Sequence, residues 1–194
     1  WRGYFKGWLE HRPEVWRRYK KNVMSYVDQL EKNAGLARRY ETAINSKTGI
    51  DCFDIWAREL IETGYLHNHA RMWFASIWIY TLELPWELGA DFFYRHLLDG
   101  DPASNTCSWR WICGLHTTGK TYLARASNIE QFTQSRFNPE GQLALDAPSM
   151  SEPSLPELIT PNFKSADLIG RRYGLLMTEE DISIDSLGLS NPSA

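Results

Sequence analysis

Residues 67–84 have the sequence HNHARMWFASIWIYTLEL, and this stretch decides the fold class. Its apolar side chains lie nearly all round a helical projection, a distribution typical of a helix that is buried at the centre of a domain. They are Met72, Phe74, Ala75, Ile77, Trp78, Ile79 and Leu82. We predict one central helix from His67 to Leu84, with other helices packed around it.

The neighbouring segments have helical patterns too. From Pro13 to about residue 32, apolar residues recur at spacings of three and four, and proline suits the first turn of a helix. Asp101 followed by Pro102 is a typical helix start, because the carboxylate can accept hydrogen bonds from free N–H groups. The remaining helices are predicted over residues 52–63, with Gly64 as the C-cap, and over residues 86–98. The sequence therefore predicts an all-α fold, a helical bundle.

The composition excludes several classes of protein. The chain has 194 residues, of which 43% are hydrophobic and 23% charged, so it can bury a core and is not disordered overall. Its net charge of -3 argues against a protein that coats nucleic acid through bulk charge, and no apolar run reaches the roughly 18–20 residues of a membrane span. Cys52, Cys107 and Cys113 form no paired disulfide framework and lack zinc-type partners, which predicts a cytoplasmic protein without a bound metal.

The chain divides into two parts by composition. Residues 1–141 hold the helical pattern, whereas residues 142–194 are rich in Pro and Ser and predict an extended tail that could lie against the body, with a short last helix near residues 178–181. Residues 1–48 carry eleven Lys/Arg against five Asp/Glu, a charge of +6 that could face either a polyanion or solvent. Because the sequence begins at Trp1 without Met, we expect it to be part of a longer protein.

Residues 114–121, GLHTTGKT, match the phosphate-binding P-loop pattern G-x-x-x-x-G-K-[ST]. A functional P-loop follows a buried strand of a parallel sheet, but residues 104–113 have the pattern of a capped helix and the segments before them are helical too. We interpret the match as accidental and the segment as a polar loop. A P-loop nucleotide-binding protein stays as a distant alternative, which Mg²⁺-ATP binding that is lost on Lys120→Ala would support.

Polar side chains gather on single faces of two predicted helices. These sets, at spacings of three and four, are Asn68 with Arg71, and Asp101 with Asn105 and Trp109. Asp101 lies at a helix N-terminus, where the helix dipole favours negative charge. Asp99 could pair bidentately with Arg71 and hold its guanidinium in place. If the two helices face each other, they form a cleft whose few polar groups can orient a large planar ligand.

Four separated blocks occur along the chain, namely KTG at residues 47–49, TGYLHNHARM at 63–72, LDGDPASN at 98–105 and WRW at 109–111. In their order and spacing they resemble the C-terminal FAD-binding domain of the DNA photolyase and cryptochrome family. The resemblance implies the all-α fold of that domain and non-covalent FAD as the cofactor. It also implies that residues 1–141 are a partial FAD-binding domain, and that the N-terminal antenna domain belongs to another part of the same protein.

The resemblance also implies roles at the flavin. Asn105 matches the residue that photolyases keep next to the reactive flavin nitrogen, whereas plant cryptochromes carry Asp there, so the sequence leans toward the repair branch. Arg71 and Asp99 match the pair beside the isoalloxazine, and Asp101 matches the ribose contact. The full expected set of cofactor-binding residues is Tyr65, Asn68, Arg71, Asp99, Gly100, Asp101 and Asn105.

Tryptophans have two implied roles in the family. Trp109 and Trp86 match the flavin-proximal and middle members of an electron-transfer chain, although both could simply be core aromatics. The third position falls on Asn33, so Tyr40 or Trp16 would have to substitute, or the route differs. The second role is to cradle an extruded pyrimidine dimer. The residues expected to contact the dimer or DNA are Trp1, Asn68, His69, Met72 and Trp111.

His69 stands where the family commonly has Arg, and residues 117–128 depart from the family pattern, which indicates an outlying bacterial-type branch. We expect a fragment of a photolyase-like flavoprotein, a carbon–carbon lyase that acts on damaged DNA through light-driven electron transfer from reduced FAD. The alternative is a cryptochrome-type blue-light photoreceptor that binds the same cofactor and performs no repair.

Overall fold

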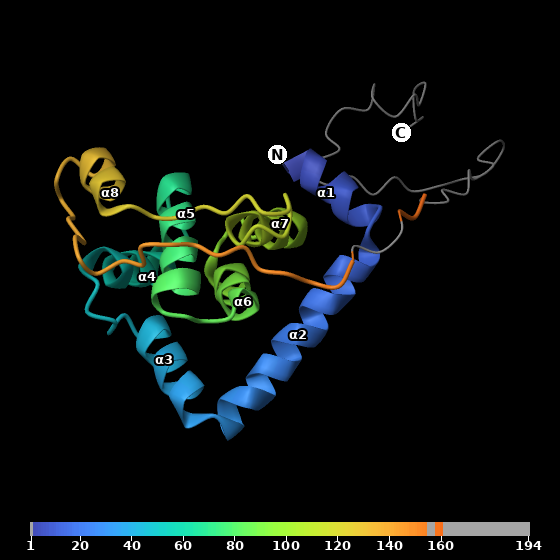
Figure 1. The fold of residues 1–194 in the computed structure, drawn as a ribbon, viewed down its shortest axis with the longest axis horizontal. Helices are drawn as coiled ribbons and strands as arrows, with labels where there is room; N and C mark the ends of the chain where they lie inside the picture. Colours follow the sequence, from blue (N-terminus) through green and yellow to red (C-terminus); the bar gives the residue numbers. More distant parts are fainter. Residues whose placement is uncertain (1, 155–157, 161–194) are drawn as a thin grey trace, which may run out of the picture. The chain divides into compact units, whose positions relative to one another are not determined.

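The computed structural model describes residues 2–154 and 158–160, and this part confirms the all-α prediction. Helices and no strands are found there (Figure 1). The helices are α1 (Arg2–Glu10), α2 (Pro13–Lys32), α3 (Ala34–Ile44), α4 (Asp51–Thr63), α5 (Asn68–Ser76), the π-helix η1 (Ile77–Thr81), α6 (Trp86–His96), α7 (Pro102–Ile112) and α8 (Ala126–Phe132). The helix predicted near residues 178–181 lies outside the described residues.

The helix predicted over residues 67–84 is present over Asn68–Thr81, three residues shorter at its C-terminal end, and it changes its winding midway. α5 ends at Ser76, and η1 continues with a bond from the N–H of Leu82 to the carbonyl of Ile77, 2.9 Å long. This i→i−5 bond is the mark of a π-helix. The run Ile-Trp-Ile from Ile77 consists of branched and aromatic residues, which lose rotamer freedom in an α-helix. Trp78 is nevertheless fully buried, so the predicted central position is correct.

The predicted helix boundaries agree closely with the structure where a capping residue marks them. Pro13 occupies the first turn of α2, and Gly64 ends α4 with a left-handed φ of 68°, which glycine adopts without strain. Asn33 separates α2 from α3, and its side chain accepts a 3.0 Å hydrogen bond from the N–H of Leu36. The sequence analysis did not predict α1, α3 or α8.

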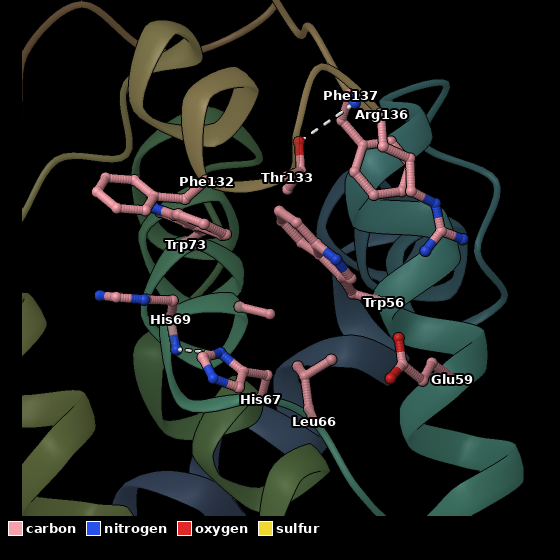
Figure 2. Close-up of a pocket in the computed structure, with 11 residues that line it drawn as sticks. Trp56, Glu59, Leu66, His67, His69, Trp73, Phe132, Thr133, Arg136 and Phe137 are labelled. Atoms are coloured by element: carbon pink, nitrogen blue, oxygen red, sulfur yellow. Dashed lines mark hydrogen bonds between the residues drawn. The ribbon is translucent and has the colours of Figure 1, made fainter.

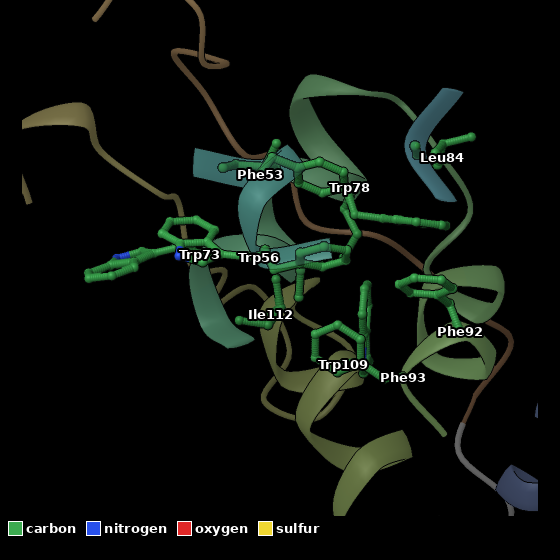
Figure 3. Close-up of a cluster of buried hydrophobic side chains, with 14 of the residues drawn as sticks. Phe53, Trp56, Trp73, Trp78, Leu84, Phe92, Phe93, Trp109 and Ile112 are labelled. Atoms are coloured by element: carbon green, nitrogen blue, oxygen red, sulfur yellow. The ribbon is translucent and has the colours of Figure 1, made fainter. Parts of the chain in front are cut away.

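Aromatic rings hold the centre of the fold together. Trp56 of α4 stacks on Trp73 of α5 with ring centres 5.6 Å apart (Figure 2). The next residue of α5, Phe74, stacks on Phe53 of α4 with ring centres 4.2 Å apart. Trp78 packs against several rings of this cluster and meets Trp109 of α7 edge-on at 6.3 Å (Figure 3). α4, η1 and α7 are thus joined through one continuous set of ring contacts.

Gly89 in α6 allows two of these indoles to reach the helix backbone. A Cβ atom placed there would lie 2.5 Å from Cζ3 of Trp109 and 2.9 Å from Nε1 of Trp78, and it would also overlap Cη2 of Trp109. The indole N–H of Trp78 donates a 2.9 Å hydrogen bond to the carbonyl of Pro85 just before α6. Any side chain at residue 89 would therefore displace Trp109, Trp78 or α6.

Residues 114–121 form turns that follow directly on α7, and the described part of the chain has no strand on which a P-loop could be built. The interpretation of this segment as a loop is therefore correct. His116 packs among the aromatic side chains of α1, with its ring centre 4.8 Å from that of Trp8 and 5.3 Å from that of Phe5. Burial and the nearby guanidinium groups of Arg110 and Arg12 lower the pKa of His116.

Residues 142–154 contain no helix or strand and lie against the helices. The N–H of Ala144 donates to Oγ1 of Thr81 at 3.0 Å, and the N–H of Met150 donates to the carbonyl of Cys113 at 3.0 Å. Glu152 accepts hydrogen bonds from the buried guanidinium of Arg110, one of them 2.9 Å long, and lies 3.3 Å from Nη1 of Arg18. This carboxylate neutralises a cation on the same helix as Trp109. Within the described residues, no helix is both long and apolar enough to cross a membrane.

We predict that Gly89→Ala lowers the free energy of unfolding by about 1–3 kcal/mol, because the added methyl group overpacks the contact with Trp109. Urea-induced unfolding of the purified chain measures this effect. Gly7→Ala in α1 is the matched control, since a Cβ there meets open space and removal of a helical glycine stabilises by about 0.5–1 kcal/mol. A Gly89→Ala variant as stable as the parent would show that the indoles do not need this close approach.

Candidate functional site

A cavity of about 430 Å³ lies where α1, α5, α6 and α7 meet. Its size is within the range of small-molecule sites. Most residues selected from the sequence line this one cavity, although they come from two separate helices and the loop before α7. They are Asn68, Arg71 and Met72 of α5, Asp99, Gly100 and Asp101 of the loop, and Asn105, Trp109 and Trp111 of α7.

The predicted pairing of Arg71 with Asp99 is confirmed. Nη1 of Arg71 lies 3.2 Å from Oδ2 of Asp99, and Nη2 lies 3.1 Å from Oδ1, so the two groups meet in a bidentate arrangement. Nε of Arg71 donates to the carbonyl of Leu66 at 2.6 Å, which fixes the plane of the guanidinium. Arg2 of α1 also contacts Asp99. Its Nη2 donates a 3.1 Å hydrogen bond to the backbone carbonyl of Asp99 and lies 3.4 Å from the Asp99 carboxylate. Asp99 therefore holds two cations at one side of the cavity.

Asp101 caps α7 as predicted. Its Oδ2 accepts a 2.7 Å hydrogen bond from the N–H of Ser104, while Oδ1 lies 3.6 Å from Nζ of Lys6. The cap leaves the hydroxyl of Ser104 buried without a hydrogen-bond partner, although Ser104 lines the cavity. A buried polar atom without a partner is costly unless a ligand or water satisfies it. Ser104 is therefore a ready hydrogen-bonding group for a molecule in this cavity.

Asn105 and Trp109 continue the same face of α7 toward the core. Asn105 is buried, and its amide donates a 2.7 Å hydrogen bond to the carbonyl of Ala90 in α6, so its orientation is fixed. The Trp109 indole is 2% exposed and packs edge-on against Phe93 with ring centres 5.1 Å apart. Trp111 also lines the cavity but is 37% exposed and stacks on Tyr122 at 5.7 Å. The two indoles of α7 therefore differ: the Trp109 ring is buried and the Trp111 ring is accessible.

The cavity suits a flavin chemically. Its walls include the apolar side chains of Ala75, Phe93, Leu97 and Ile112, which can cover a flat ring system. The polar groups described above are few and rigid, a combination typical of sites that orient a large planar ligand. The unpartnered Ser104 hydroxyl is a further polar group of this lining that a bound molecule could satisfy.

Four residues selected from the sequence lie elsewhere. Tyr65 is outside the cavity lining, with its ring centre 5.9 Å from the guanidinium carbon of Arg71. His69 lines a second cavity on the neighbouring face of α5, together with His67 and Trp73. Trp86 is buried in the core and stacks on Tyr19 at 5.6 Å, and Trp1 is outside the described residues.

Sequence reasoning missed several residues of the cavity. Ser104 and Ser108 lie three and seven residues after Asp101, so the helical spacing that selected Asn105 and Trp109 also contained the signal for them. Arg2 and Phe5 come from α1, which the sequence analysis did not predict. Their approach to the cavity depends on the packing of α1 against α7, for which the sequence has no local signal.

The described residues offer little to thiol or metal chemistry. Burial raises the pKa of the Cys52, Cys107 and Cys113 thiols to about 12 each, so all three stay protonated and weakly nucleophilic. No group of three or more His, Cys, Asp or Glu side chains within the described part is placed to hold a metal ion.

Comparison with known proteins gives a consistent result. Residues 1–145 match the model of the FAD binding domain of DNA photolyase. The chain is similar to a deoxyribodipyrimidine photo-lyase of Vibrio cholerae, with 26% identity over 139 residues, which cover 66% of this chain and 29% of the relative. It is also similar to the photo-lyase of Thermus thermophilus, with 36% identity over 103 residues (53% and 24%), and to cryptochrome-1 of Arabidopsis thaliana, with 34% identity over 96 residues (50% and 14%).

The chain thus spans less than a third of the length of these relatives. The matched residues nevertheless include the whole cavity described above. Together, the helical fold, the cavity and the family match show that the chain belongs to the FAD-binding domain family of DNA photolyases and cryptochromes, whose cofactor is FAD.

Proposed function

We propose that this chain is the flavin-binding part of a photolyase-like protein that repairs pyrimidine dimers in DNA with light. The observation that carries the proposal is one cavity that extends from a buried indole, Trp109, to an accessible one, Trp111, between the polar groups of α5 and α7. FAD, when bound in reduced form and excited by light, supplies the electron that splits the dimer and afterwards recovers it. The protein binds the flavin and the dimer, orients them relative to each other and excludes water from the cavity.

The polar groups of the cavity support a role in holding the flavin. The Arg71–Asp99 pair can bind the polar edge of the isoalloxazine, and Asn105 has a fixed amide beside it. Asp101 and the Ser104 hydroxyl are suited to ribose hydroxyls, with Gly100 leaving the backbone accessible. A Cβ at Gly100 would lie 2.9 Å from the carbonyl of Leu97, so this close turn needs glycine. Asn68 is the remaining polar residue of α5 that would contact the flavin. Tyr65 would hold the Arg71 guanidinium in place through its ring, without touching the flavin itself.

The accessible end of the cavity supports the binding of an extruded dimer. Trp111 of α7 presents a partly exposed indole to this cavity. Asn68 and Met72 of α5 line the same cavity, and Nδ2 of Asn68 lies 3.9 Å from the Met72 sulfur. Extrusion costs least for a damaged base, and aromatic side chains replace the stacking that it loses. We propose damaged DNA as the partner, with His69 and Trp1 as further contacts.

The buried aromatic cluster supports a route for electrons to the flavin. Trp78 touches Trp109 and donates its N–H to the carbonyl of Pro85, the residue before Trp86, so it lies between the two proposed members of the chain. From Trp86, stacked rings continue through Tyr19 at 5.6 Å to Trp16 at 5.2 Å. Trp16 is half-buried and can replace the member missing at Asn33.

The proposed function also requires parts of the protein beyond this chain. Because the chain spans 29% of the Vibrio cholerae relative, we propose that the remaining flavin contacts and an N-terminal antenna domain come from other parts of the same protein. In this proposal residues 1–141 form the flavin-binding part and residues 142–194 the tail. Three free, buried cysteines support a cytoplasmic location.

A cryptochrome-type photoreceptor without repair is the second candidate, favoured by the similarity to cryptochrome-1. Asn105 argues for repair, since plant cryptochromes carry Asp at the corresponding position. Both candidates bind FAD in the same cavity, so activity on DNA distinguishes them.

We predict that blue light removes pyrimidine dimers from an oligonucleotide incubated with the full-length protein, and that darkness abolishes the loss. Trp111→Ala should weaken dimer binding about tenfold or more without loss of flavin, because one stacking ring is removed. Met24→Ala, at a side chain 70% exposed on α2, is the control. Bound flavin with no dimer loss under light would favour the photoreceptor.

We predict that Asp99→Asn weakens FAD binding about tenfold, or roughly 1.4 kcal/mol, because Arg71 loses its anionic partner. The flavin content of the purified full-length protein and titration of the apoprotein with FAD measure the effect. Asp146→Asn, at an exposed residue outside the cavity, should bind FAD like the parent. Equal affinity in both variants would refute the assignment of the Arg71–Asp99 pair.

We predict that Trp86→Phe slows bleaching of the oxidised flavin bands under blue light with an external reductant, because phenylalanine is far harder to oxidise than tryptophan. Trp56→Phe replaces an equally buried indole outside the route and should bleach at the parent rate. Tyr19→Phe should slow bleaching as well if electrons enter from the reductant through Trp16. Unchanged rates in the Trp86 variant would exclude this route.

A further inference from the structure

A second cavity, of about 410 Å³, lies between α4, α5, α8 and residues 133–137 (Figure 2). It flanks the same helix as the flavin cavity. Asn68, Arg71 and Met72 of α5 face the flavin cavity, whereas His69 and Trp73 line the second one. The two cavities are therefore neighbours along the first turns of α5.

A stack of four aromatic rings extends from the core to solvent in this cavity. Trp56 and Trp73 are 4% and 3% exposed, with ring planes 23° apart. His69 stacks on Trp73 at 5.6 Å and 18°, and Phe132 of α8 meets His69 at 5.6 Å and 34° (Figure 2). Phe132 is 57% exposed, so the stack ends on a ring that is accessible to a ligand.

The stack is held rigidly at its inner end. The indole N–H of Trp73 donates a 3.0 Å hydrogen bond to Oδ1 of Asn128 in α8, which ties α5 to the helix that carries Phe132. The hydroxyl of Thr133 accepts a 3.3 Å hydrogen bond from the N–H of Phe137 across the turn that follows α8 (Figure 2). A preformed platform loses little entropy when a flat ligand stacks on it.

The polar groups around the stack favour an anion. Arg136 lies with its guanidinium carbon 5.0 Å from the ring centre of Phe137, and within residues 2–154 and 158–160 it has no carboxylate at salt-bridge distance. The side chains of His67 and His69 are exposed, and Glu59 is the single acidic residue in the lining. An aromatic platform beside a guanidinium group is the arrangement with which proteins bind unpaired nucleotides.

We propose that this second cavity binds an unstacked base of the DNA strand that flanks the lesion, with its phosphate near His67, His69 and Arg136. The inference rests on the proposed function, because it assigns the cavity to the same DNA substrate. The base stacks on the exposed end of the Phe132–His69 pair while the dimer occupies the neighbouring flavin cavity. The chain therefore prefers single-stranded or locally opened DNA to an intact duplex, whose bases remain stacked on each other.

Binding of an undamaged, labelled oligothymidylate to the full-length protein in the dark, followed by fluorescence anisotropy, tests this proposal. Phe132→Ala should weaken binding roughly five- to a hundredfold, the range for loss of one base–aromatic stack, and Phe132→Trp should restore it. Arg136→Gln should reduce the slope of log affinity against log salt concentration by about 0.7, as expected for one lost phosphate contact with a single strand. Leu145→Ala, which removes an apolar side chain 95% exposed, is the matched control.

An unchanged melting temperature shows that the variants fold, since Phe132 and Arg136 are both exposed. Parent-like affinity of Phe132→Ala for the single strand would overturn the proposal, as would an equal loss of affinity for a duplex of the same length. Because this assay needs neither light nor turnover, its result is separate from dimer repair. If the parent protein binds the single strand through Phe132 but repairs no dimers, only the proposed function is refuted. If it repairs dimers but its single-strand binding does not depend on Phe132, only the proposed role of the second cavity is refuted.

Discussion

The approach of two indole rings to the backbone of α6 at Gly89 is the constraint on which the rest of the structure depends. Trp78 comes from η1 and Trp109 from α7, and both reach the same point because residue 89 has no side chain. Their edge-on contact then sets how α7 packs beside η1 and α6. The position of α7, and with it the place of the polar groups that line the cavity between α5 and α7, depends on this buried contact, because protein interiors are packed too tightly to shift freely.

α7 shows how one short helix can supply several different chemical groups to one site. Its N-cap is Asp101, its middle carries the buried amide of Asn105, and its last turns carry a buried and an accessible indole. The opposite face of the helix is equally specialised, since Arg110 is buried and neutralised by Glu152 from the extended segment. The segment after residue 141 thus stabilises the same helix that forms the site.

α5 has a comparable position between two cavities. Its first turn separates a site with few, rigid polar groups from a site built of stacked rings with one guanidinium, that of Arg136. The Arg71–Asp99 pair connects α5 to the loop before α7 on one side, and the Trp73–Asn128 hydrogen bond connects it to α8 on the other. A DNA strand that crosses α5 would meet both cavities in succession, which relates the two proposals physically.

The sequence by itself determined the all-α class, the helix ends with strong local signals and most of the polar residues that line the cavity between α5 and α7. Pro13, Gly64 and Asp101 act on their own backbone, and Asn105 and Trp109 share a face through helical spacing alone, so neither depends on distant contacts. Family resemblance added the placement of the Arg71–Asp99 pair beside the isoalloxazine and the choice of FAD. The π-turn after Ser76, the contribution of α1 and the ring stack from Trp56 to Phe132 were decided only by the tertiary structure. Each of these depends on side chains far apart in sequence that fill the same space, and local periodicity contains no information about which ones meet.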